Sequence, residues 1–162
     1  MLVVDTSAFI SLAVGGVFET VLDEFDIVTT QVVLDELEQT AAYDDHHGDG
    51  ASIVLDAVDR ITVVDTTGEE FVTSRIDDGE ASCVAAVRDV GAVFLITDDY
   101  RALPELQNVV DAEVALSPIV LRALVKRGSL TTEEANSAFE AIAAGRDWLG
   151  APIYRYARTL FE

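Results

Sequence analysis

Acidic residues stand where two apolar segments of the sequence end. Residues 2–4 are apolar and are followed by Asp5, and the apolar run 92–96 is followed, after one threonine, by Asp98 and Asp99. Short apolar runs of this kind are typical of strands buried in a sheet. If the two strands are parallel neighbours, their carboxyl ends lie at one edge of the sheet, and the carboxylates converge there.

Two further acids are placed to join them. Glu36 lies in a helical pattern, VVLDELEQ, and Glu80 lies at the start of another, DGEAS. Four carboxylates in one cleft repel one another unless a cation is present. Oxygen ligands without Cys or His favour Mg²⁺ or Mn²⁺, and such an ion suits phosphoryl chemistry because it lowers the pKa of a bound water. Asp99 is a candidate for a further metal ligand.

The segments between these acids alternate between short apolar runs and helical patterns. This alternation is typical of βαβ units, and strands without a polar face indicate a sheet covered on both sides. We therefore predict an α/β fold with a central parallel sheet. Strands are predicted at 2–4, 27–29, 61–65, 92–96 and 113–116, and helices at 8–13, 17–25, 31–40, 51–58, 69–76, 78–90, 102–108, 117–127, 131–144 and 148–161, with a polar loop at 43–50.

Length and composition restrict the class of protein. A chain of 162 residues, half of them hydrophobic, is predicted to form one domain with a sizeable core. The single cysteine, Cys83, excludes an internal disulfide bond. The sequence shows no apolar run of membrane-spanning length and no basic region before the first strand, so we predict a cytoplasmic protein without a membrane anchor.

The charge is strongly negative and unevenly distributed. Thirty acids, of which 17 are Asp, oppose ten bases, of which only Lys126 is a lysine, and the net charge is −20. Excess Asp with almost no Lys favours a halophilic protein that works in molar salt; the alternative is an acidic protein that binds a basic partner. Residues 117–162 carry six bases against five acids, together with Trp148, Tyr154, Tyr156 and Phe161. If the protein binds an anion or a second subunit, we expect this segment to be the more favourable side.

At these motifs the sequence resembles the PIN domain, a family of compact metal-dependent ribonucleases that includes toxin nucleases and RNA-processing endonucleases. The resemblance rests on VVDTSAFISL at the N-terminus, VVLDEL near position 35, DGEASCVAAV in the middle and LITDDYRAL near position 98. It covers residues 1–105, and residues 117–162 are similar, less specifically, to the C-terminal part of a toxin-related subgroup. It implies a three-layer fold over 1–162 with 117–162 as a helical extension.

The resemblance also implies roles for individual residues. The four catalytic, metal-binding acids would be Asp5, Glu36, Glu80 and Asp98. Hydroxyl groups of Thr6 or Ser7, and of Thr97, would support them. Neighbouring acids are alternatives at two of these positions. Asp35 and Glu38 could take the place of Glu36, although Leu37 directly after it favours Glu36. Asp77 and Asp78 could take the place of Glu80.

The implied function is a Mg²⁺- or Mn²⁺-dependent endoribonuclease that cleaves single-stranded RNA, of toxin or RNA-processing type. The resemblance further implies a homodimer, with an antitoxin-like protein as a possible partner. The alternative is a PIN fold that has become a catalytically silent binding or regulatory module. Other phosphoryl enzymes do not match: haloacid-dehalogenase phosphatases need a second Asp where Ser7 stands, a receiver domain needs a lysine nearer than Lys126, and no GxxxxGK[ST] loop is present.

Overall fold

The structure, a computed structural model, describes residues 1–161 and contains a five-stranded, all-parallel sheet. The spatial order of its strands is β3-β2-β1-β4-β5. Their bounds are β1 (Leu2–Val4), β2 (Ile27–Thr30), β3 (Thr62–Val64), β4 (Phe94–Ile96) and β5 (Glu113–Ala115). The predicted α/β fold with a central parallel sheet is confirmed, and each predicted strand is present to within two residues at each end.

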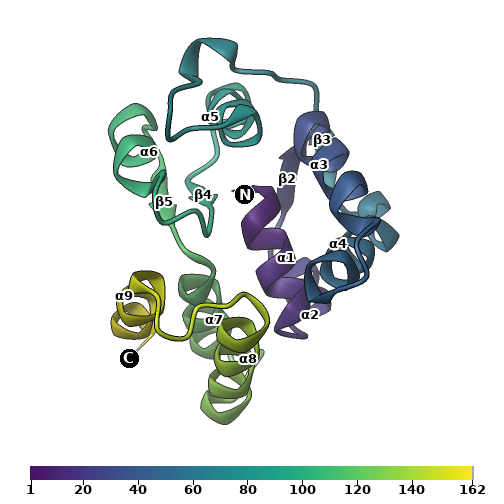
Figure 1. Ribbon diagram of the computed structural model, residues 1–162, viewed down its shortest axis with the longest axis vertical. Coiled ribbons are helices and arrows are strands. Elements are labelled where there is room, and N and C mark those ends of the chain that lie inside the picture. The colour runs from purple at the N-terminus through teal and green to yellow at the C-terminus, as the bar shows by residue number, and fades with distance from the viewer. Residues whose placement is uncertain (162) are drawn as a thin grey trace.

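Helices connect and cover these strands (Figure 1). They are α1 (Thr6–Val14), α2 (Phe18–Glu24), α3 (Gln31–Ala41), α4 (His46–Asp56), α5 (Asp78–Val90), α6 (Leu103–Val109), α7 (Ser117–Lys126), α8 (Thr132–Gly145) and α9 (Pro152–Phe161), with the short 3₁₀ helices η1 (Val58–Arg60) and η2 (Glu69–Phe71). Two of the helices begin at capping boxes, formed by Asp77 with Glu80 for α5 and by Thr131 with Glu134 for α8.

The order in which the chain adds strands to the sheet reverses beside β1. From β1 the chain moves outward to β2 and then β3, and it returns to β4 on the other side of β1. In register, Val3 lies opposite Val28 of β2, and Val4 lies opposite Ile96 of β4. In open parallel sheets, ligands bind beyond the carboxyl ends of the strands at such a reversal. Asp5 and Asp98 follow these two strands and therefore lie at this point of the sheet.

The core is continuous from the sheet into the C-terminal helices. Helix α5 packs across β1, β2 and β4, and α1 contacts α7 and α8. Figure 1 shows α7, α8 and α9 gathered at one end of the molecule, with α5 at the other. Tyr154 and Phe161 of α9 stack on Phe139 of α8, with ring centroids 5.7 and 5.2 Å apart. Large side chains excluded from solvent include Phe9, Leu12, Leu37, Leu95, Ile96, Leu106, Leu116, Leu121, Leu124 and Ile142.

Local structure differs from the sequence prediction at several places. Helix α4 begins at His46, inside the predicted polar loop 43–50, because the Asp45 side chain caps it by accepting from Gly48 N at 2.8 Å. The predicted helix 69–76 is only the 3₁₀ turn η2. Helix α9 begins at Pro152 rather than at 148, after a loop in which Asp147 and Gly150 have positive φ angles.

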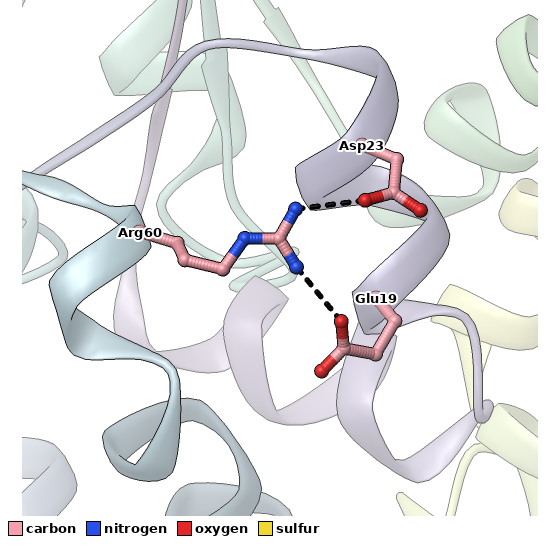
Figure 2. Close-up of polar contacts among 3 residues, drawn as sticks. All are labelled: Glu19, Asp23 and Arg60. Carbon is pink, nitrogen blue, oxygen red and sulfur yellow. Dashed lines mark hydrogen bonds and ion pairs between the residues drawn. The ribbon is translucent and has the colours of Figure 1, made fainter.

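On the acidic surface, one base pairs with two carboxylates. Figure 2 shows Arg60 of η1 between Glu19 and Asp23 of α2, with Nη1–Oε2 and Nη2–Oδ1 distances of 2.8 and 2.7 Å. The two acids are one helical turn apart, so a single guanidinium reaches both. All three side chains are exposed, and salt at molar concentration screens such pairs.

Within residues 1–161, no single helix is both long and apolar enough to cross a membrane. The helices α1 and α2 meet the length and composition only when taken together, as a pair bent by 115°.

Candidate active site

The predicted acids line one cleft of about 470 Å³ at the carboxyl edge of the sheet. Asp5 and Asp98 come from the ends of β1 and β4, Glu36 from α3, Glu80 from the first turn of α5, and Asp99 from the turn after Asp98. The competing acids Asp35, Glu38 and Asp78 are exposed and do not line the cleft, whereas Asp77 does. The structure therefore brings together five residues that lie up to 94 positions apart in the sequence.

Asp5 is held by three donors. Its Oδ1 accepts from Ser7 Oγ at 2.8 Å and from Ala8 N at 3.2 Å, and its Oδ2 accepts from Thr97 Oγ1 at 2.7 Å. Asp5 thus also serves as the N-cap of α1. Burial raises the pKa of Asp5 from 3.8 to about 7, with a further increase from the charge of Asp98, although the three hydrogen bonds offset part of the shift.

Asp98 is fixed by the backbone of a different helix. Its Oδ1 accepts from Ser117 N, the first residue of α7, at 2.7 Å, and its own N–H donates to Ser7 Oγ at 2.9 Å. Ser7 therefore links the two aspartates directly. The second oxygen, Asp98 Oδ2, is buried and has no hydrogen-bond partner among the described residues. Burial raises the pKa of Asp98, and the hydrogen bond from the Ser117 N–H together with the Arg146 charge offsets part of this increase.

Glu36 is half-buried and faces the amino end of α5. Its Oε1 accepts from Thr6 Oγ1 at 2.6 Å, so Thr6 and Ser7 support different acids. Burial raises the pKa of Glu36; the Thr6 hydrogen bond lowers it, and the negative charges of Asp77 and Asp78 raise it further.

Gly79 makes this position of Glu36 possible. A Cβ atom on Gly79 would overlap the Glu36 carboxylate. Gly79 lies in the first turn of α5, where alanine is ordinarily the better helix former by about 1 kcal/mol.

We therefore expect Gly79→Ala to leave the unfolding temperature unchanged or to raise it slightly, while it displaces Glu36 and lowers any activity of the cleft by about tenfold or more. Thermal unfolding and cleavage assays on the same preparation check this. Gly16 and Gly145 are not matched controls, because Gly16 has a positive φ angle and a Cβ atom on Gly145 would lie 2.6 Å from Val14 Cγ1. Full activity in Gly79→Ala would show that the cleft does not depend on Glu36.

Glu80 combines a structural contact with a site contact. Its Oε1 accepts from Asp77 N at 2.9 Å, and Asp77 Oδ1 accepts from Glu80 N at 2.8 Å, which completes the capping box of α5. Glu80 also shares a hydrogen bond with Asp99. Burial, followed by the Asp99 contact and the Asp5 charge, raises the pKa of Glu80 strongly, although the Asp77 backbone hydrogen bond lowers it in part.

The donor set fits a hard divalent cation by type and charge. All five side chains offer carboxylate oxygens. Burial raises the pKa of four of them, repulsion from neighbouring acids adds to the shift in Asp5, Glu36 and Glu80, and Asp98 Oδ2 lacks a partner. Among residues 1–161, however, no three His, Cys, Asp or Glu side chains are placed to hold one ion together as they stand. The carboxylates instead bond to hydroxyls, backbone N–H groups and one another, so they would need to rotate to converge on an ion.

Arg146 also lines the cleft, although no sequence motif predicted this position. It follows α8 as the C-cap residue and lies outside every motif that identified the acids. Its only sequence signal was membership of the six bases after residue 116. Of the other five, Arg122 donates to Leu160 O, Arg127 pairs with Glu24, and Arg158 donates to the Tyr154 hydroxyl.

The chain as a whole matches one family. The family described as PIN domain (DUF3368) matches residues 1–162. Neither the curated proteins nor the solved structures contain a significant match to the chain.

Proposed function

Because the chain belongs to the PIN-domain family, whose membership indicates a nuclease-type function, we propose that it is a metal-dependent endoribonuclease acting on single-stranded RNA. The observation that carries the proposal is the juxtaposition of Asp5 and Asp98 at the strand reversal, where one hydroxyl, Ser7 Oγ, contacts both residues. Glu36 and Glu80 face the same cleft from two helices. Such a cluster is the kind of oxygen-ligand set that phosphoryl-transfer enzymes use.

Hydrogen bonds from neighbouring residues would orient the carboxylates of this cluster and favour their ionised form. Ser7 and Thr97 hold both oxygens of Asp5, and the α7 amide holds one oxygen of Asp98, leaving the other available. A bound Mg²⁺ or Mn²⁺ would supply two things: a lowered pKa for a water molecule and a positive charge opposite the phosphate. The reaction is the hydrolysis of a phosphodiester, in which water adds to phosphorus, the P–O bond breaks, and the leaving oxygen takes a proton.

A groove beside the cleft supports an unpaired substrate. Tyr100 follows Asp99 directly, and its ring lies 5.3 Å from that of Tyr156 in α9. Together with the exposed Arg155 they line a groove of about 400 Å³. Unpaired bases stack on aromatic rings, and guanidinium groups contact phosphates, whereas paired bases in a duplex are not free to stack in this way. The buried Trp148 is not available for such stacking.

The alternative, a silent binding or regulatory module, is favoured by one observation. The carboxylates are engaged with one another and with hydroxyls, and no three of them in the described chain stand ready to hold an ion. Such a module need not bind Mn²⁺ at the cleft. In a calorimetric Mn²⁺ titration of the protein and of an Asp98→Asn variant, absence of binding by the parent would therefore favour the module, whereas the nuclease requires binding that the variant loses.

Neighbouring residues of α3 offer a matched pair of variants for the cleavage test. Glu36→Gln removes a cleft carboxylate, whereas Glu38→Gln removes an exposed one two positions away and changes the net charge equally. We expect Glu36→Gln to lower cleavage of a labelled single-stranded RNA by about a hundredfold or more and Glu38→Gln to retain parental activity. The assay is run in molar KCl with Mn²⁺ or with EDTA, and a duplex of the same sequence serves as the second substrate.

Three outcomes of this assay contradict the proposal or part of it. Cleavage that persists in EDTA removes the metal requirement. Equal rates for the two variants remove Glu36 from the site. A parent protein that binds Mn²⁺ but cleaves neither substrate supports a binding module.

The oligomeric state and protein partners stay predictions. The family resemblance implies a homodimer and, for toxin-type relatives, an antitoxin-like partner. Light scattering of the purified protein in molar KCl tests the dimer: a mass near twice 17.4 kDa is expected, and a mass of 17.4 kDa contradicts it.

A further inference from the structure

The acidic cleft contains one base. Among the described residues that line it, Arg146 alone carries a positive charge, and it faces Asp5 and Asp98. It follows the last residue of α8 directly. Asp147, directly after it, is the one residue other than glycine within 1–161 with a positive φ angle, 57°. The backbone at this position is therefore held in a conformation that non-glycine residues seldom adopt.

Arg146 faces the acids without being paired to them. None of the ion pairs within residues 1–161 includes it, and its Nε is buried without a hydrogen-bond partner. Asp98 Oδ2, across the cleft, is also buried and unpartnered. Burial lowers the pKa of the guanidinium, and the charges of Asp98 and Asp5 raise it. A guanidinium is seldom left without a partner where it is partly buried, so the unpartnered Nε beside the acids indicates that Arg146 is available to bind an anion.

The guanidinium and the carboxylates that line the cleft indicate which kind of ligand can bind there. A guanidinium offers planar N–H donors that match the oxygens of a phosphate, and the carboxylates on the other side suit a cation. A phosphodiester held by Arg146 on one side would present its remaining oxygens toward the Asp5–Asp98 pair. A base placed only to neutralise the acids would instead be expected to bond to one of them.

We propose that Arg146 is the phosphate-contacting residue of the cleft and that it positions the phosphodiester against the Asp5–Asp98 pair. This inference rests on the proposed nuclease function for its substrate. It assigns to one residue of the C-terminal segment the role of holding an anion inside an otherwise acidic site.

If Arg146 has this role, replacing it should affect Mn²⁺ affinity and RNA affinity in opposite ways, which a purely structural role would not do. Removing a positive charge from the cleft should leave Mn²⁺ affinity unchanged or raise it several-fold, because one repulsive charge is lost. The same change should weaken the contact with RNA, since charge-assisted hydrogen bonds typically contribute about tenfold to a hundredfold. A merely structural arginine would lower metal affinity and thermal stability together when it is replaced.

The test compares Arg146→Gln, Arg146→Lys and Arg88→Gln with the parent. Arg88 is exposed near the end of α5 far from Glu80, so its replacement changes the net charge equally outside the cleft. We expect Arg146→Gln to lower kcat/KM on a labelled single-stranded RNA by about tenfold to a hundredfold. Arg146→Lys should recover part of this loss, and Arg88→Gln should match the parent. Mn²⁺ titration by calorimetry and thermal unfolding are recorded on each variant.

Either of two results would overturn the inference: parental kcat/KM in Arg146→Gln, or a joint loss of Mn²⁺ affinity, unfolding temperature and activity. If the parent does not cleave RNA, the nuclease proposal fails, and the same oligonucleotide then serves as an uncleaved probe in fluorescence anisotropy with Mn²⁺. Weaker binding by Arg146→Gln than by Arg88→Gln still supports the phosphate contact in that case. Equal binding by the two variants, or no binding by the parent, refutes it.

Discussion

Replacing Asp5 by asparagine should abolish RNA cleavage while leaving the fold intact. Asn keeps an oxygen that can accept from Ala8 N at the cap of α1, and it is nearly the same size as Asp. What it loses is the negative charge at the centre of the cleft. Because that charge is expected to contribute several kcal/mol to holding a divalent ion, we expect a fall in cleavage of about a thousandfold or more.

The unfolding temperature provides a second readout for the same variant. Mn²⁺ should raise the unfolding temperature of the parent, because an ion that binds only the folded state stabilises it. The increase should be much smaller for Asp5→Asn. Asp44→Asn, an exposed aspartate outside the cleft, changes the charge equally and should behave as the parent. Parental cleavage by Asp5→Asn would remove Asp5 from the proposed mechanism, and an equal Mn²⁺ response would remove it from the metal site.

The convergence of the acids was predictable because it depends on strand order. Asp5 and Asp98 each follow a short apolar run, and parallel strands place such residues at one edge. Glu80 was identifiable from its helix-start pattern, and the structure shows that it also completes a capping box. For Glu36, adjacent acids competed, and only the orientation of α3 distinguishes the residue that faces the cleft from its exposed neighbours.

Arg146 could not be placed in this way because its position depends on tertiary packing. It lies beyond the end of α8, and its approach to the cleft is set by how α8 packs against α1 and by the turn at Asp147. None of these features has a local sequence signature. The prediction of a polar loop at 43–50 was wrong for a different reason. Two glycines and a run of charged residues indicated a loop, but the Asp45 cap starts α4 there, and contacts with α1 and α3 stabilise this helix.

In EDTA and molar KCl, the protein should become more stable as the pH falls from 8 to 5. The pKa of Asp5 is raised from 3.8 to about 7 by burial. Between these two values the folded state binds a proton that the unfolded state has released, so stability is lost as the pH rises through this window. For Asp5 alone the full difference is roughly 4 kcal/mol. The raised pKa values of Glu36, Glu80 and Asp98 act in the same direction.

Urea unfolding at several pH values measures this dependence, and Asp5→Asn isolates the share of Asp5. The variant should show a flatter dependence and should be more stable than the parent at pH 8 in EDTA, because it carries no buried charge to desolvate. General repulsion within a chain of net charge −20 acts in the same direction but is common to both proteins, and molar salt screens it within about 3 Å.

Saturating Mn²⁺ should remove or reverse the dependence in the parent, since binding requires ionised carboxylates and is weakened by protons. Identical pH profiles for parent and variant would show that Asp5 is ionised in the folded protein without cost, and the cleft would then have no unmet need for a cation.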